Sequence, residues 1–104
     1  SPRVFFDTDP AKLHVPNERI DKADPIKLQR QISRHGRTLA GMPPVLVYRG
    51  SDGEMVLSDG VTRATRIAKL SPETQIPAEL LGTLPFPVGH LPTIQEKLPE
   101  YGNP

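Results

Sequence analysis

Cysteine and tryptophan are both missing from this chain of 104 residues, and aromatic side chains make up only 5% of it. The core must therefore be built mostly from aliphatic side chains. Without cysteine there is no disulfide, no thiolate metal ligand and no cysteine nucleophile, which fits a reducing compartment such as the cytoplasm. No run approaches the roughly 18 apolar residues that would span a bilayer, and no signal-peptide pattern opens the chain. We expect a soluble protein with no membrane partner.

A strong net charge is also missing, because 13 basic and 12 acidic residues give a formal charge of only +1. The charges are nevertheless unevenly placed: residues 1–25 carry −1, residues 26–70 carry +5 and residues 71–104 carry −3. Local fields rather than the total charge decide what binds. The sequence therefore predicts a basic centre between two acidic flanks.

Proline is the one residue type in excess, at 13 of 104, against a usual frequency of about 5%. Only two prolines fall within 26–70, whereas seven fall within 71–104. Because proline interrupts helices and sheets, regular structure is expected mainly in the middle. We predict one domain over residues 1–82, followed by an extended proline-rich tail over 83–104.

The first helix is predicted from Pro25 to His35. An Asp at the N-cap, here Asp24, accepts hydrogen bonds from free amides, and proline is favourable at the first helical position. Gly36 is a typical terminator. At 100° per residue the outer face carries a basic stripe that a loop residue extends, and it would steer an anionic ligand: Lys27, Arg30, Arg34 and Arg37.

Further along the chain, residues 44–49 and 54–58 read as two strands joined by a hairpin turn at 50–53. Residues 61–70 follow as a second helix, with Ala64, Ile67, Ala68 and Leu70 facing inward and Arg66 and Lys69 facing outward. Residues 4–6 and 76–81 are expected to be extended, the latter as an edge strand because Pro77 cannot donate to a ladder.

The turn between the second strand of the hairpin and the second helix is the candidate functional site. A glycine permits a tight turn, and the unpaired amides of a helix start favour an anion such as phosphate. A threonine hydroxyl and a planar guanidinium add donors for phosphate oxygens. The plainer interpretation is that Asp59 caps the helix and Arg63 forms a surface ion pair. The predicted phosphate ligands are Gly60, Val61, Thr62, Arg63 and Arg66.

The order of these elements resembles the ParB/sulfiredoxin superfamily. The resemblance covers about residues 20–82. The elements that carry it are, in chain order, a capped helix, a Gly-containing loop, the Pro44-Val45-Leu46-Val47-Tyr48 strand, the Asp-Gly hairpin, the Gly60 to Arg63 turn and Ile76-Pro77-Ala78. The resemblance implies an α+β fold with a short mixed sheet and two main helices, which the proline-rich tail would follow. It also implies that the Gly-x-x-Arg turn binds the phosphates of a nucleotide or nucleic acid. Sulfinic acid reductase activity is not implied, because the turn reads Asp59-Gly60-Val61-Thr62-Arg63, with no cysteine.

Three functions stay open at this point. In the first, the domain hydrolyses its ligand as a nuclease or nucleotide hydrolase, with Asp59 or His35 assisting and a divalent metal as a conceivable cofactor. This would suit a toxin domain of a longer chain, since the sequence does not begin with Met. No His, Asp and Glu spacing predicts a resident metal. In the second, the turn only binds. In the third, the proline-rich tail docks on a protein partner.

Overall fold

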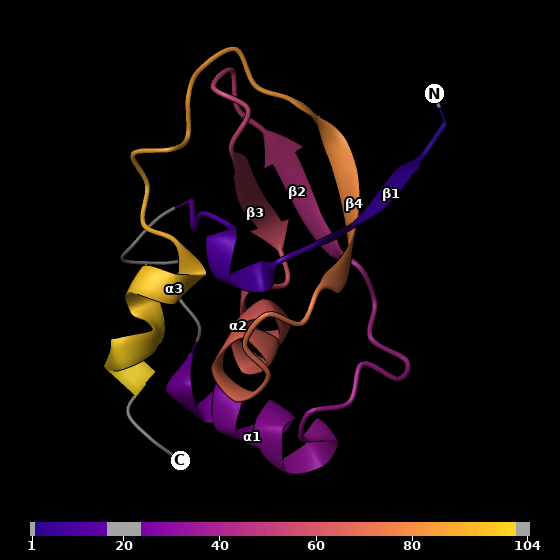
Figure 1. Ribbon diagram of the computed structural model, residues 1–104, viewed down its shortest axis with the longest axis vertical. Helices are drawn as coiled ribbons and strands as arrows, with labels where there is room; N and C mark the ends of the chain where they lie inside the picture. The colour runs from indigo at the N-terminus through magenta and orange to yellow at the C-terminus, as the bar shows by residue number, and fades with distance from the viewer. Residues whose placement is uncertain (1, 17–23, 102–104) are drawn as a thin grey trace.

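The segments that the sequence predicts to be extended form one mixed sheet. The computed structural model describes residues 2–16 and 24–101. Four strands lie in the spatial order β1 (Val4–Thr8), β4 (Ile76–Thr83), β2 (Val45–Arg49) and β3 (Met55–Asp59) (Figure 1). β4 is antiparallel to β1 and parallel to β2, while β2 and β3 are antiparallel. The expected α+β class, with a mixed sheet and a β2–β3 hairpin, is confirmed.

The position of β4 corrects one expectation. Pro77 predicts an edge strand, yet β4 lies inside the sheet, between β1 and β2. The register explains why proline is tolerated there: Pro77 pairs with Asp7 of β1, whereas pairing with β2 begins one residue later, at Ala78 opposite Val45. At Pro77 the strand therefore has a partner on one side only, which is where a missing N–H is compatible with a sheet.

The helices begin and end where local signals place them. In α1 (Pro25–His35) the Asp24 carboxylate accepts hydrogen bonds from the amides of Ile26 at 2.8 Å and Lys27 at 3.4 Å. The helix ends at Gly36, whose φ of 55° suits glycine. The remaining helical elements are α2 (Val61–Leu70), the short α3 (Ile94–Lys97) and 3₁₀ turns at Pro10–Lys12 and Leu98–Tyr101.

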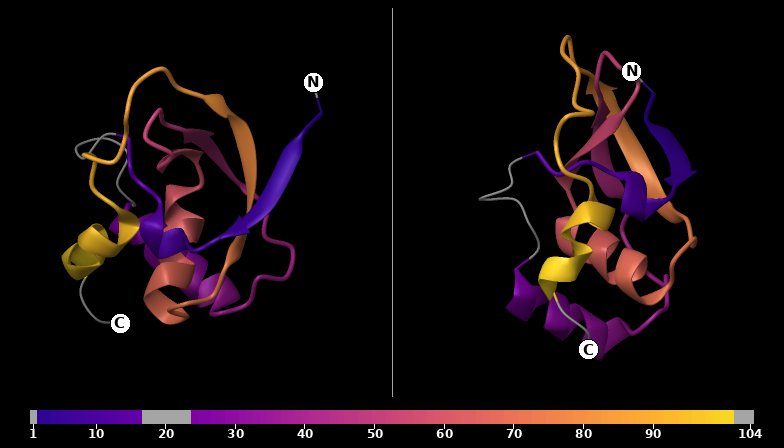
Figure 2. Two further views of the ribbon diagram at one scale, coloured as in Figure 1. Left: turned by 45° about the horizontal axis from the view of Figure 1, so that its top comes forward. Right: turned by 60° about the vertical axis from the view of Figure 1, so that its left-hand side comes forward.

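Helix α2 is held between the sheet and α1 (Figures 1 and 2). Its apolar face is buried as expected, except that Leu70 is only partly buried. Each fully buried Val, Leu or Ile side chain contributes about 1.5–3 kcal/mol, so this packing fixes the start of α2 relative to the strand before it. The core joins Ala64, Ile67 and Ala68 of α2 to Val45, Val47, Leu57, Ile76 and Ala78 of the sheet.

The proline-rich segment after β4 also differs from expectation. Instead of leaving the domain as an extended tail, residues 84–101 cross from the end of β4 to α3 and pack on the domain (Figure 1). Val88 and Ile94 are each 1% exposed, and the amide of Ile94 donates to the Leu13 carbonyl at 2.9 Å. Proline content therefore predicted the irregular backbone but not the burial of the apolar residues between the prolines.

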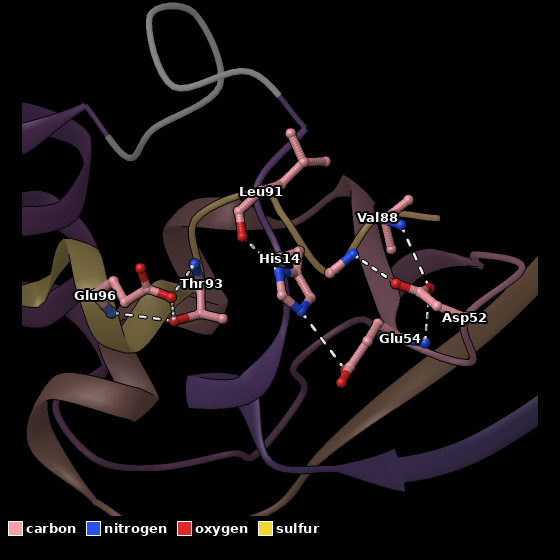
Figure 3. A network of polar contacts seen from close by, with 8 residues as sticks. His14, Asp52, Glu54, Val88, Leu91, Thr93 and Glu96 are labelled. Atoms are coloured by element: carbon pink, nitrogen blue, oxygen red, sulfur yellow. Dashed lines mark hydrogen bonds and ion pairs between the residues drawn. The ribbon is translucent and has the colours of Figure 1, made fainter. Parts of the chain in front are cut away.

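Two side chains attach this returning segment, as Figure 3 shows. The carboxylate of Asp52, in the β2–β3 turn, accepts hydrogen bonds from the amides of Gly89 at 2.8 Å and Val88 at 3.4 Å. Nδ1 of the buried His14 donates to the Leu91 carbonyl at 2.7 Å, and its Nε2 lies 3.5 Å from the Glu54 carboxylate. The hairpin turn therefore serves as an anchor for the chain that follows β4.

The Asp52 anchor predicts an acid-sensitive stability. Desolvation alone would raise the pKa of Asp52, but hydrogen bonds from the amides of Gly89, Val88 and Glu54 lower it below its ordinary value. A lowered pKa in the folded state adds stability above the unfolded value of about 3.9. That stability is lost as the pH falls through the folded pKa.

In urea titrations from neutral to strongly acidic pH, we expect the difference in unfolding free energy between wild type and Asp52→Asn to shrink on acidification. The pKa of Glu79 is also lowered, by the Arg3 hydrogen bond. Because Glu79 is present in both proteins, its contribution cancels in this difference. A difference independent of pH would contradict the anchor's ionic character.

Candidate functional site

A polar cleft of about 610 Å³ opens between the first half of α1 and the start of α2. The β3–α2 turn forms one wall and the outer turns of α1 form the other. The fold thus brings part of the basic stripe next to the turn that the sequence singles out. The α1/α2 cleft, as we call it, is lined by Asp24, Lys27, Arg30, Gln31, Ser58, Asp59, Gly60, Val61, Thr62 and Arg63.

Gly60 makes the turn into α2 and can hardly be another residue. Its φ of 106° and ψ of 20° lie in the left-handed region, which L side chains rarely adopt. A Cβ built on Gly60 would lie 2.7 Å from Cγ1 of Val45 and 2.9 Å from Cζ of Arg63. The glycine therefore lets the start of α2 approach strand β2 and the Arg63 guanidinium.

The start of α2 has no side-chain cap among the residues that the structure describes. The N-cap position is Gly60 and not Asp59, and the first turn contains no acidic residue. The first amides of a helix have no intrahelical acceptor, and the helix dipole adds positive potential there. The plainer interpretation of Asp59 as the helix cap is thus wrong. Its carboxylate, 67% exposed, lies 3.7 Å from Nη2 of Arg63 instead.

The guanidinium of Arg63 is already engaged by the chain itself. Its Nε donates to the Pro43 carbonyl at 3.0 Å and its Nη2 donates to the Pro44 carbonyl at 2.7 Å. The side chain is only 17% exposed, although it borders the α1/α2 cleft. Arg63 therefore ties the loop before β2 to α2, and only the part of it that faces the cleft is available to a ligand.

Arg66 is buried, although the sequence predicts that it faces outward. It is 2% exposed, and its Nη1 donates to the carbonyls of Gly36 at 2.7 Å and Thr38 at 3.0 Å. Its Nε donates to Oε1 of Gln31 at 3.3 Å, and burial lowers the pKa of Arg66. It does not line the α1/α2 cleft. The predicted phosphate ligand is therefore a buried side chain that holds the end of α1 and the following loop.

The two candidate catalytic side chains do not line the same cleft. Asp59 lines the α1/α2 cleft, whereas the exposed His35 lies at the far end of α1. His35 borders a groove along α1 and a cavity of about 50 Å³ beneath the 40–43 loop. An acid–base pair acting on one ligand must converge on the reacting atoms. The geometry groups Asp59, and not His35, with the uncapped start of α2.

The basic stripe is divided between two concave surfaces. Lys27 and Arg30 line the α1/α2 cleft, while Arg30 and Arg34 line a second groove of about 590 Å³ along α1. Arg37, exposed in the loop after α1, lines neither surface. Arg30 therefore joins the two surfaces.

Three polar residues line the cleft that the sequence does not predict as site residues: Asp24, Gln31 and Ser58. Gln31 lies one turn after Lys27, so helical spacing alone places both near one face. Ser58 comes directly before Asp59 at the end of β3. Asp24 is recognisable only as a cap, and its carboxylate does accept the capping hydrogen bonds.

Comparison with known proteins does not assign the chain to a family. Neither a scan against protein-family models nor a search of curated protein sequences finds a match to this chain. Over residues 2–16 and 24–101, no three His, Asp or Glu side chains are grouped so that they could hold a metal ion. Within the same residues, none of the helices is long and apolar enough to cross a membrane.

Proposed function

We propose that this chain is a phosphate-binding domain of ParB/sulfiredoxin type that binds a nucleotide or a nucleic acid in the α1/α2 cleft. The observation that carries the proposal is the juxtaposition of an uncapped helix start with two exposed cations. Residues 60–63, Lys27 and Arg30 all line one cleft. Backbone amides at a helix start, supplemented by cationic side chains, are a common way of binding phosphate.

Each group has a distinct part in the proposed site. The amides at the start of α2 and the Thr62 hydroxyl donate to the phosphate oxygens, and Lys27 and Arg30 neutralise charge from the opposite wall. Arg63 gives the cleft its shape through its hydrogen bonds to the 43–44 backbone and adds positive potential. Asp59 is the single acidic side chain of the turn and faces the same space.

A binding module is favoured over a hydrolase by two observations. The guanidinium of Arg63 is bonded to backbone carbonyls, and His35 lies outside the cleft that contains Asp59. If the domain hydrolyses its ligand, Asp59 is the remaining candidate base, and Asp59→Asn should abolish turnover of ATP, CTP or DNA in the presence of Mg²⁺ or Mn²⁺ while binding persists. Docking through the tail is disfavoured, because residues 84–101 pack on their own domain.

Anion binding in the α1/α2 cleft should change the chemical shifts of particular amides and should depend on particular side chains. In NMR titrations with ATP, CTP and tripolyphosphate, the amides of residues 60–66 should shift most. Arg30→Gln should weaken binding about three- to tenfold, which corresponds to about 0.7–1.4 kcal/mol for one charge-assisted contact at a solvent-open site. Arg49→Gln is the matched control, because Arg49 is exposed and lies outside the cleft. Unchanged spectra with all three anions would overturn the proposal.

A further inference from the structure

The second groove along α1 begins where the α1/α2 cleft ends. Both surfaces include Arg30 and Gln31, and their volumes, about 610 and 590 Å³, are similar. The second groove adds Arg34 one helical turn further along. A ligand that filled the first cleft and continued in the same direction would therefore meet a new cation directly.

The cations along this path are evenly arranged. Lys27, Arg30 and Arg34 lie within about 60° of one another around α1 and extend along about 10 Å of its axis. One strand of B-DNA rises about 3.4 Å per phosphate along the duplex axis. An extended single strand spaces its phosphates more widely, so the row is long enough for about two or three of them. A mononucleotide, which carries its phosphates in one short chain on a single sugar, would use only one end of the row.

The absence of acidic side chains strengthens this inference. Residues 25–51 contain no Asp or Glu, so α1 has no acidic side chain of its own. Exposed helices usually mix both signs of charge. The acidic groups at the cleft are engaged: the Asp24 carboxylate accepts amides of α1, and Asp59 lies beside Arg63. The charged side chains that α1 itself places along the path are therefore all basic, and the acidic side chains lie at the α1/α2 cleft end.

We propose that the groove beside Arg34 is a second phosphate subsite and that the ligand is a single-stranded oligonucleotide, bound along α1 from the α1/α2 cleft. This inference rests on the proposed function, because the first phosphate occupies that cleft. A single row of cations matches one strand rather than the two strands of a duplex. No Phe, Tyr or Trp is among the described lining residues of either surface, and His35 is the one ring beside the row, so the contacts are mainly to the backbone. Gln29 and Ser33, beside the row, supply neutral hydrogen bonds.

The test is a length series of labelled oligothymidylates, from dinucleotide to dodecanucleotide, measured by fluorescence anisotropy beside ATP and CTP. Affinity should rise with length until about three phosphates are covered, and log Kd should vary with log salt with a slope of about 2 in magnitude, or about 0.7 per cation. Arg34→Gln should weaken the octanucleotide about three- to tenfold and lower the slope by about 0.7, leaving ATP and CTP binding unchanged. Arg34→Lys should restore most of the loss, and Arg49→Gln should change nothing.

Each other outcome has a defined meaning. If ATP or CTP binds but affinity does not rise with length, or if Arg34→Gln has no effect, the second subsite is wrong and the phosphate cleft stands. If a duplex of equal length binds as tightly as the single strand, the proposed ligand is wrong. If oligonucleotides bind with a dependence on Arg34 but the amides of 60–66 do not shift, the proposed cleft is wrong. If none of the probes binds, both proposals fail.

Discussion

Replacing Arg66 with methionine should lower the free energy of unfolding by about 3 kcal/mol. The methionine side chain has a similar length but no hydrogen-bond donors. The carbonyls of Gly36 and Thr38 and the Gln31 amide oxygen would then lose the partner that now satisfies them in a part-buried setting. Each buried polar group left without a partner costs about 1–3 kcal/mol. Because the carbonyls belong to the backbone, they cannot be removed together with the charge.

The measurement is urea unfolding followed by circular dichroism, with Arg30→Met as the control. Arg30 is an exposed basic residue of the neighbouring helix, and its replacement should change stability by less than about 0.5 kcal/mol. Arg66→Lys should fall between the two, because an ammonium can donate to the same carbonyls but lacks the planar fork. A loss below about 1 kcal/mol for Arg66→Met would mean that the two carbonyls are hydrated in the folded protein.

Arg66 and Arg63 together define how the loop before β2 is held. They are one turn apart on α2, and each donates to two backbone carbonyls of the 36–44 segment, Arg66 at its beginning and Arg63 at its end. Leu39 and Met42 of the same segment pack against the core. The α1/α2 cleft therefore owes its shape to arginines whose hydrogen bonds are mainly internal.

Elements specified by adjacent residues could be predicted from the sequence. Asp24, Pro25 and Gly36 delimit α1, and the Asp52-Gly53 turn delimits the hairpin, because capping and turn formation are local interactions. The position of β4 inside the sheet depends instead on which strands become its neighbours. Pro77 by itself does not indicate whether a second strand pairs with the rest of β4 on the side opposite β1.

The candidate site could be predicted only in part, for the same reason. Helical spacing places Lys27, Arg30 and Arg34 on one face of α1, but not the direction in which that face looks. Packing of α1 on α2 puts Lys27 and Arg30 in the cleft and Arg34 in the next groove. The burial of Arg66 follows from the loop that covers it. Helical periodicity alone cannot distinguish a solvent-exposed arginine from a buried one that donates hydrogen bonds to backbone carbonyls.

Replacing Gly60 with alanine should be the most damaging small substitution at the site. Two costs add: an L residue in the left-handed region costs about 1–2 kcal/mol, and forcing a methyl group into a packed position costs about 1–3 kcal/mol. The added Cβ would lie 2.7 Å from Cγ1 of the buried Val45 and 2.9 Å from Cζ of Arg63. We therefore expect a total loss of about 2–5 kcal/mol in unfolding free energy.

Gly41 provides a control that separates the two costs. Its φ of 71° is also left-handed, but a Cβ there would meet no atom within 4 Å. Gly41→Ala should therefore lose only the conformational part, about 1–2 kcal/mol, and should leave anion binding intact. Gly60→Ala should lose more stability and should also weaken ATP and tripolyphosphate binding in the fraction that remains folded, because relieving the contact displaces either the start of α2 or Arg63. Equal losses for the two variants would mean that the turn relaxes freely, and the cleft at the start of α2 would then not be preorganised for an anion.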